Sequence, residues 1–226
     1  MKQKHFTHIP RNIDNIVCEQ INEESGRYYK TPEGKLFPSV TTVVGDAGKE
    51  NIKAWRKRVG EEEANKISNK ATSRGTRVHT ICEHYLDNEP IDSVVTLFDL
   101  DAFKQIKKVL DEHVDNVHMQ ETRLYSNYLE VAGTVDCVAE YDGELSVIDF
   151  KTSTKLKNPD WILGYRCQAT AYAIMYEELF GVPVPQTVII IAVDDEPEAQ
   201  VFIQKRNHYV VPLLQMRKAY KEKYNI

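Results

Sequence analysis

The stretch GTVDCVAEYDGELSVIDFK, residues 133–151, predicts a β-hairpin. Two runs rich in Val, Ile and Cys are joined at Asp142-Gly143, a dipeptide that tolerates the positive φ angles of a two-residue turn. Counting outward from that turn places Asp136 directly across from Asp149. Like charges opposed on neighbouring strands destabilise a sheet, so we expect a compensating positive charge between them.

Strand alternation assigns the side chains of this hairpin to faces. Asp149 and Lys151 project from one face, whereas Ile148 and Phe150 project from the other. Paired carboxylates on rigid strands suit a hard divalent cation such as Mg²⁺ or Mn²⁺, and our first hypothesis is a metal site at Asp136 and Asp149. The alternative is a solvated face that carries an Asp-Lys ion pair.

Composition limits the class of protein. The chain has 226 residues, of which 42% are hydrophobic and 28% charged, as in soluble globular proteins. No apolar run approaches the roughly 20 residues of a membrane span, and the first residues lack the apolar core of a secretory signal, so we expect a cytoplasmic protein without membrane partners. The net charge of −5 argues against a globally basic nucleic-acid coat but permits a local basic groove. We expect buried thiols at Cys18, Cys82, Cys137 and Cys167.

We expect one domain, because no linker or low-complexity tract interrupts the chain. Residues 1–26 are weakly patterned and predict an irregular lead-in. Residues 27–117 predict a hairpin, flanking Thr31-Pro-Glu-Gly34, followed by a helical part. Residues 118–226 predict the core of the domain.

The run Val40–Val44 is either a strand or a helix capped by Ser39. Ser39 comes directly before this run, and Thr41 is its second residue, so both hydroxyl groups lie near its start. Hydroxyls and free backbone N–H groups at a helix start suit phosphate binding, although capping alone also explains them. Trp55 beside Arg56 and neighbouring lysines fits single-strand binding, where bases stack and phosphates pair. The alternative for Trp55 is packing under a solvated helix face.

Residues 52–86 are helical in character. Within them His79 and Glu83 are four apart and share a helical face, and Arg74 and Arg77 are close enough to reach a nearby polyanion. Imidazole beside carboxylates extends the metal hypothesis and favours Mn²⁺ somewhat. The alternative is a structural histidine.

A helix over 99–117 and a strand over 118–125 come before the central hairpin. With any loop of even length, Glu121 shares the face of Asp136 and becomes a third acid of the site, unless it is an outward-facing residue of an edge strand. Gln168 and Tyr172 share one face of a helix over 160–180. Strands over 187–193 and 200–204 and a helix over 209–224 follow, which predicts an α/β (α+β) fold with helices packed on a central mixed sheet.

Four groups of residues together resemble one family. The series Gly133-x-x-Asp136, Asp149-x-Lys151 and Gln168-x-x-x-Tyr172, preceded by Gly75-Thr-x-x-His79, resembles the RecB-like branch of the PD-(D/E)XK nucleases. The text around Arg27, Phe37 and Arg74 further resembles the mitochondrial genome maintenance exonucleases and their bacteriophage relatives. The resemblance runs from about Arg27 to the C-terminus.

The resemblance implies a restriction-endonuclease-like core and a metal-dependent DNA exonuclease of replication, repair or recombination, acting on single strands or ends. It implies that His79, Asp136, Asp149 and the Phe150 carbonyl hold one or two Mg²⁺ or Mn²⁺ ions. Lys151 would position or activate the attacking water. Gln168 and Tyr172 would support the site or the strand being cut.

Some relatives carry an iron–sulfur cluster on one upstream and three C-terminal cysteines. No cysteine follows Cys167 here, so we expect no such cluster. Two alternatives stay open: a structure-specific endonuclease on the same core, and an inactive nucleic-acid-binding recombination protein.

Overall fold

The structure is a computed structural model that describes residues 4–24 and 26–225. Its elements in chain order are β1 (Glu19–Glu23), β2 (Gly26–Lys30), β3 (Leu36–Pro38), α1 (Val40–Asp46), α2 (Lys49–Val59), α3 (Glu61–Leu86), α4 (Leu100–His113), β4 (Val114–Ser126), β5 (Val131–Tyr141), β6 (Glu144–Ser153), the 3-10 helix η1 (Pro159–Trp161), α5 (Leu163–Phe180), β7 (Gln186–Val193), β8 (Gln200–Lys205), the 3-10 helix η2 (Arg206–Tyr209) and α6 (Val210–Tyr224). Within these described ranges, no helix is both long and apolar enough to cross a bilayer.

The central hairpin forms as the sequence predicts. β5 pairs antiparallel with β6, and Tyr141 faces Glu144 across the turn. The turn residues Asp142 and Gly143 have φ angles of 52° and 80°, the left-handed conformation that a two-residue turn of this kind requires. The register continues to Cys137 opposite Ile148, so the next residue on each strand is one of the two predicted acids.

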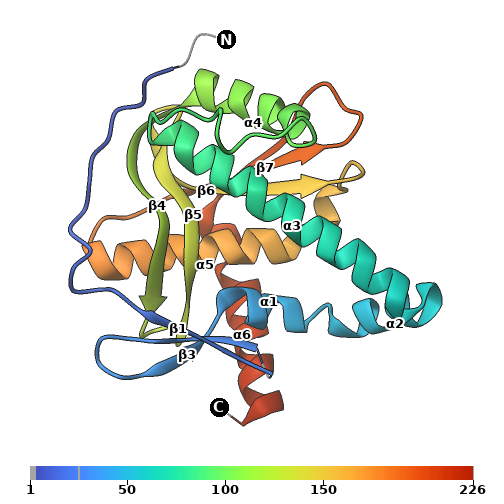
Figure 1. Ribbon diagram of the computed structural model, residues 1–226. Coiled ribbons are helices and arrows are strands. Elements are labelled where there is room, and N and C mark those ends of the chain that lie inside the picture. The colour runs from blue at the N-terminus through green and yellow to red at the C-terminus, as the bar shows by residue number, and fades with distance from the viewer. Residues whose placement is uncertain (1–3, 25, 226) are drawn as a thin grey trace.

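A mixed sheet in the order β4-β5-β6-β7-β8 is built around this hairpin (Figure 1). β6 and β7 are parallel, and the other neighbouring pairs are antiparallel. α5 supplies the crossover from β6 to β7 that a parallel pair needs. A separate sheet of β1, β2 and β3 contains the predicted N-terminal hairpin. The predicted α/β class with a central mixed sheet is confirmed.

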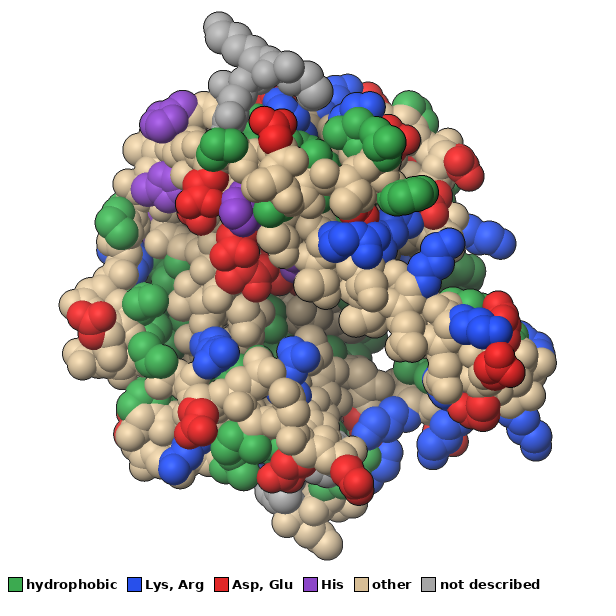
Figure 2. Space-filling model, in the orientation of Figure 1, with side chains coloured by type: hydrophobic (Ala, Val, Ile, Leu, Met, Phe, Trp, Pro, Cys, Tyr) green, Lys and Arg blue, Asp and Glu red, His purple; other side chains and the backbone are tan. Residues whose placement is uncertain are grey.

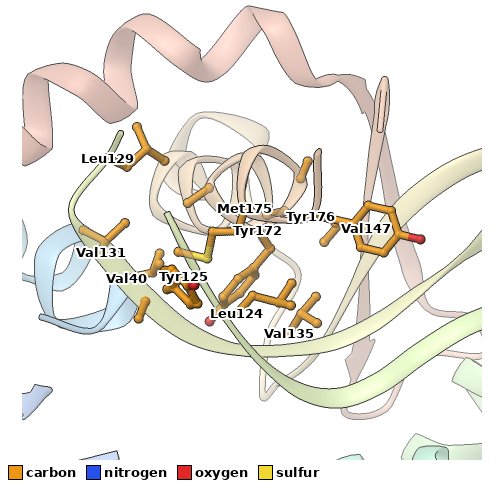
Figure 3. Close-up of a cluster of buried hydrophobic side chains, with 14 of the residues drawn as sticks. Val40, Leu124, Tyr125, Leu129, Val131, Val135, Val147, Tyr172, Met175 and Tyr176 are labelled. Carbon is orange, nitrogen blue, oxygen red and sulfur yellow. The ribbon is translucent and has the colours of Figure 1, made fainter. Parts of the chain in front are cut away.

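The two faces of the sheet bury different helices. On one face, Val135 and Val147 pack in a cluster with Tyr172, Met175 and Tyr176 of α5 (Figure 3). On the opposite face, the hydrophobic cluster is built from the sheet together with α3 and α4. α5 therefore covers the sheet face from which the hairpin acids were predicted to project.

Ile148 and Phe150 belong to the cluster on the α3 and α4 side, as the strand alternation predicts. Both side chains are almost fully buried, at 0% and 2% exposure. Burial of a large apolar side chain contributes about 1.5–3 kcal/mol, so these two residues fix which face of β6 points to which helix. A one-residue slip would reverse that choice.

A glycine separates α2 from α3. Gly60, with φ of 88°, ends α2 and precedes the run Glu61-Glu62-Glu63 that opens α3. Acidic residues in a first turn interact favourably with the helix dipole. α2 and the start of α3 form an arm that extends from the body of the molecule (Figure 1). The helical character predicted for residues 52–86 is confirmed, and the structure divides this stretch into two helices.

Two boundary predictions are wrong. The lead-in contains a strand, because Glu19 to Glu23 pair with β2; residues 1–3 and 25 lie outside the described residues. β1 has no buried residue, so backbone pairing with β2 forms it and no apolar pattern marks it. The helix expected to Val117 ends at His113, because β-branched Val114 and Val117 enter β4.

Asp99 ties the segment before α4 to α3. Its side chain is fully buried and accepts hydrogen bonds from Arg77 Nε at 2.8 Å, Arg77 Nη2 at 2.9 Å and Thr96 Oγ1 at 2.6 Å. The Arg77 guanidinium lowers the pKa of this carboxyl, even though burial opposes the shift. A lowered pKa stabilises the fold above the ordinary value and loses that contribution as the pH falls through the folded value.

Replacing Asp99 with asparagine is therefore expected to lower the free energy of unfolding by about 2 kcal/mol at neutral pH, since the buried charged hydrogen bonds are lost. Urea denaturation at pH 7 measures the change. Asp101→Asn is the matched control, because that carboxylate is exposed and pairs with the exposed Lys104. Equal losses in both variants would contradict a specific role for Asp99.

Candidate active site

A cleft of about 480 Å³ lies where α3, α5, the central sheet and the N-terminal sheet meet. Most of its lining residues carry polar side chains, and they include most of the residues that the sequence motifs single out. The lining residues are Arg27, Tyr29, Ser39, Thr41, Gly75, Thr76, His79, Thr80, Glu83, Glu121, Gly133, Thr134, Asp136, Lys151, Gln168 and Tyr172. Segments more than 100 residues apart in the chain therefore form one site.

His79, Glu121 and Asp136 offer ligand atoms that all lie within 4.8 Å of one another. His79 Nδ1 is 3.6 Å from Glu121 Oε1 and 3.6 Å from Asp136 Oδ1. Glu121 stands opposite Asp136 because Gln120 pairs with Cys137 and Thr122 with Val135. The loop from β4 to β5 has an even length, Ser126 facing Val131, as that prediction required.

Backbone groups of Phe150 complete this cluster. Its N–H donates to Asp136 Oδ2 at 2.9 Å, and its carbonyl oxygen lies 2.8 Å from His79 Nε2. If Nε2 carries the proton of that hydrogen bond, Nδ1 faces the carboxylates with a free lone pair. A metal-ligating histidine is usually oriented in this way by a carbonyl or carboxylate on its other nitrogen.

The charge of His79 depends on its burial and on the neighbouring acids. Burial lowers the pKa of the imidazole, but Asp136 and Glu121 outweigh that effect and raise the pKa to about 9. Two acids therefore stabilise a positive charge at this position. The same negative potential favours a divalent cation, which would displace the proton from Nδ1.

Asp149 and Lys151 form a buried ion pair beside the cluster. Asp149 is only 1% exposed, its Oδ2 lies 2.5 Å from Lys151 Nζ, and its Oδ1 accepts from Gln168 Nε2 at 3.2 Å. Burial raises the pKa of Asp149 to about 6, despite the opposing charge of Lys151. The nearby carboxylate of Asp136 contributes in the same direction as burial.

The donor set fits a hard divalent ion. In the described part of the chain, Asp149 Oδ2 is buried without an aligned hydrogen-bond donor, although Lys151 lies close to it. Carboxylate oxygens, an imidazole nitrogen and a backbone carbonyl are the ligand types that Mg²⁺ and Mn²⁺ accept. The structure thus places His79, Glu121 and Asp136 in one cluster, with the Phe150 backbone in contact with His79 and Asp136. The Asp149 and Lys151 pair lies beside this cluster.

Tyr172 and Gly133 pack against each other at the floor of the cleft. A Cβ atom at position 133 would lie 2.7 Å from Tyr172 Oη and 3.0 Å from its Cε1. Gly133 therefore lets Tyr172, which is only 2% exposed, approach β5 closely. Burial raises the pKa of the Tyr172 hydroxyl, so this group stays neutral.

Replacing Gly133 with alanine is expected to cost about 1–3 kcal/mol of stability, because the new methyl group overpacks the Tyr172 ring. Chemical denaturation of both proteins measures the loss. Gly164→Ala is the control, since a Cβ at that position in α5 meets no atom within 4 Å. A Gly133→Ala protein as stable as the control would show that Tyr172 moves aside freely.

The predicted nucleic-acid residues are only partly in this cleft. Ser39 and Thr41 line it, although Ser39 also caps α1 by accepting from the Thr42 N–H at 3.0 Å. Trp55 and Arg56 lie on α2, outside the cleft lining, and Arg56 pairs with Glu61. The cations of two further arginines are neutralised elsewhere, by the ion pairs Arg74 with Asp194 and Arg77 with Asp99.

Four cleft residues are not assigned to the site by the sequence analysis: Arg27, Tyr29, Thr76 and Thr134. Arg27 is exposed on β2 and reaches the cleft because the backbone of Ser39 bridges to Ala132 at the start of β5. A local pattern cannot reveal such a bridge. For Thr76, its place in the quoted motif and its helical spacing from His79 and Thr80 are signals that could have indicated a cleft residue.

Comparison with known proteins finds a family and two similar chains. A family model described as "PD-(D/E)XK nuclease superfamily" matches residues 54–223. The human protein described as mitochondrial genome maintenance exonuclease 1 is 28% identical over 132 residues, which cover 54% of this chain and 38% of that protein. The chain thus spans well under two thirds of this relative. A crystal structure described as "Putative exonuclease", from Eubacterium rectale, matches with a TM-score of 0.44 and 17% identity, covering 68% of this chain and 65% of that one.

Proposed function

The chain belongs to the PD-(D/E)XK nuclease superfamily, and on that premise we propose that it is a metal-dependent DNA exonuclease. The observation that carries the proposal is the convergence of His79, Glu121 and Asp136 within 4.8 Å, beside the Asp149 and Lys151 pair. Family membership supports a nuclease, and the exonuclease name of the human relative favours removal of terminal nucleotides.

In this proposal His79, Asp136 and Asp149 hold one or two Mg²⁺ or Mn²⁺ ions, with Glu121 and the Phe150 carbonyl as further ligands. A bound ion supplies positive charge that acidifies water and offsets charge developing on the phosphoryl oxygens. Asp149 and Asp136 orient the water by accepting its hydrogen bonds. Gln168 keeps Asp149 in position through the hydrogen bond to Oδ1.

Lys151 places an ammonium group at the centre of the site. Its Nζ lies 2.5 Å from Asp149 and contacts the Tyr165 ring at 5.3 Å, so its position is fixed from two sides. A fixed cation in a poorly solvated cleft stabilises the negative charge of a phosphoryl transition state with little reorganisation. Lys151 therefore positions the attacking water and stabilises the transition state.

We further propose that the substrate is single-stranded DNA or a frayed end. α3 and the N-terminal sheet border the cleft on both sides, which suits one strand better than a duplex. Figure 2 shows an opening between the α2 and α3 arm and the body, with Lys and Arg side chains among Asp and Glu side chains on the arm. The last turn of α2 carries Arg56, Lys57 and Arg58, and such a local group of cations attracts phosphates even though the net charge of the chain is −5.

Digestion of end-labelled oligonucleotides tests the function. Linear single strands, linear duplexes and circular single strands are incubated with Mg²⁺, Mn²⁺ or EDTA. We expect shortening of linear single strands that requires a metal, and no cleavage of circles. Cleavage of circles would favour the structure-specific endonuclease, and inactivity with both metals would favour an inactive binding protein.

A further inference from the structure

Trp161 is displayed to solvent at the end of η1. Its side chain is 77% exposed, and Leu156 in the preceding loop is 55% exposed. Exposed large apolar side chains lose the contribution of burial, about 1.5–3 kcal/mol each. Leu156 and Trp161 are two such residues on one short segment, and their exposure indicates a binding surface.

The segment that carries Trp161 is firmly held. The Lys157 backbone N–H donates to Gln200 Oε1 at 2.7 Å, and Gln200 Nε2 donates back to the Lys157 carbonyl at 3.1 Å. The Asn158 side chain accepts from the Asp160 N–H at 2.9 Å and so caps η1. The residue after Trp161, Ile162, is 1% exposed and packs against β7. Trp161 therefore lies on a rigid turn that keeps its side chain exposed to solvent.

Trp161 lies on the segment that joins two elements of the active site. β6 carries Asp149 and Lys151, and α5 carries Tyr165 and Gln168. Tyr165 contacts Lys151, and Gln168 contacts Asp149. Trp161 is in η1, which follows β6 and comes directly before α5 in the chain.

We propose that Trp161 is a stacking platform for a nucleobase of the DNA strand being cut. This inference rests on the proposed nuclease function and names how the strand is held next to the cleft. Lys155 and Lys157, on the same segment, supply charge complementary to the phosphates. An unpaired strand is the occupant because its bases expose π faces, whereas a duplex stacks its bases internally.

Tryptophan fluorescence tests the stacking directly. The chain has two tryptophans, so Trp55→Phe leaves Trp161 as the only tryptophan, whose emission is excited selectively over that of tyrosine at long wavelength. Oligothymidylate and an abasic oligonucleotide of equal length are titrated in EDTA, which prevents metal-dependent cleavage. We expect quenching by oligothymidylate and little by the abasic strand, because both present phosphates but only one presents bases. Equal signals from both strands would overturn the proposal.

Substitutions of Trp161 measure how much its side chain contributes to the affinity for single-stranded DNA. Trp161→Ala is expected to weaken single-strand affinity about tenfold, and Trp161→Tyr to restore most of it, because tyrosine keeps an aromatic face. Phe98→Ala is the control, since Phe98 is 90% exposed but lies on the segment before α4. Anisotropy of a labelled strand gives each affinity.

The outcomes separate the two proposals. A wild-type protein that cleaves DNA while wild type and Trp161→Ala bind single strands equally would overturn the stacking platform alone. A wild-type protein that binds and quenches but cleaves nothing with Mg²⁺ or Mn²⁺ would overturn the nuclease function and leave the platform supported.

Discussion

Replacing Lys151 with methionine is expected to lower the rate of DNA cleavage at least a thousandfold, which corresponds to about 4 kcal/mol of transition-state stabilisation. Methionine keeps much of the aliphatic stem but removes the ammonium that pairs with Asp149 at 2.5 Å. The cleft walls that contact the strand stay in place. Binding of single-stranded DNA should therefore change little, and the loss should appear in kcat.

Single-turnover cleavage and anisotropy, measured on the same preparations, separate the two effects. Lys218→Met on α6 is the control for a lost lysine, because that side chain is 78% exposed and pairs only with Glu222. Circular dichroism checks the fold, since removal of Lys151 leaves a buried carboxylate without its cation. Cleavage by Lys151→Met at the wild-type rate would remove Lys151 from the mechanism.

Local patterns predict the part of this site that one hairpin builds. The register of β5 and β6 follows from the Asp-Gly turn at 142–143, because a two-residue turn fixes which residues face each other. The sheet face on which Glu121 lies follows from the even length of the loop that joins β4 to β5. Side-chain alternation then decides which acids can meet, and no tertiary information is needed for this step.

Tertiary contacts decide the rest, and the sequence does not show them. Arg27 enters the cleft only because the N-terminal sheet is bridged to β5 through Ser39 and Ala132. Arg74 shares the helix of His79, yet its charge is used to bind Asp194, 120 residues further along the chain. A basic residue near a motif thus predicts a charge in the neighbourhood but not the partner that neutralises it.

Replacing Asp136 or Asp149 with asparagine is expected to reduce affinity for Mn²⁺ by more than about a hundredfold. Each change keeps the size of the side chain but removes a charged oxygen from the proposed metal site, and loss of a direct ligand should cost more than the 10- to 100-fold typical of supporting residues. His79→Ala should weaken binding as well, because its Nδ1 lies 3.6 Å from both Glu121 and Asp136. Isothermal titration calorimetry at pH 7.5 gives the affinities.

The free energy of unfolding, measured with Mn²⁺ and with EDTA, distinguishes a loss of metal binding from damage to the fold. An ion that binds only the folded protein at a hundred times its Kd adds about 2.7 kcal/mol to the free energy of unfolding. Wild type should show this gain in Mn²⁺ over EDTA, and the two asparagine variants should not. Each variant is compared with itself in EDTA, because Asp149→Asn also leaves the buried Lys151 ammonium without its partner and lowers the stability of the metal-free protein.

Asp142→Asn is the matched control for this experiment. It lies at the turn of the same hairpin, its side chain is 59% exposed, and asparagine tolerates its φ of 52°. It should therefore keep the full gain in Mn²⁺. Full Mn²⁺ stabilisation of both Asp136→Asn and Asp149→Asn would contradict a metal centre between β5 and β6. The carboxylates would then be stabilised by Lys151 and His79 alone, as a salt-bridge network without a bound ion.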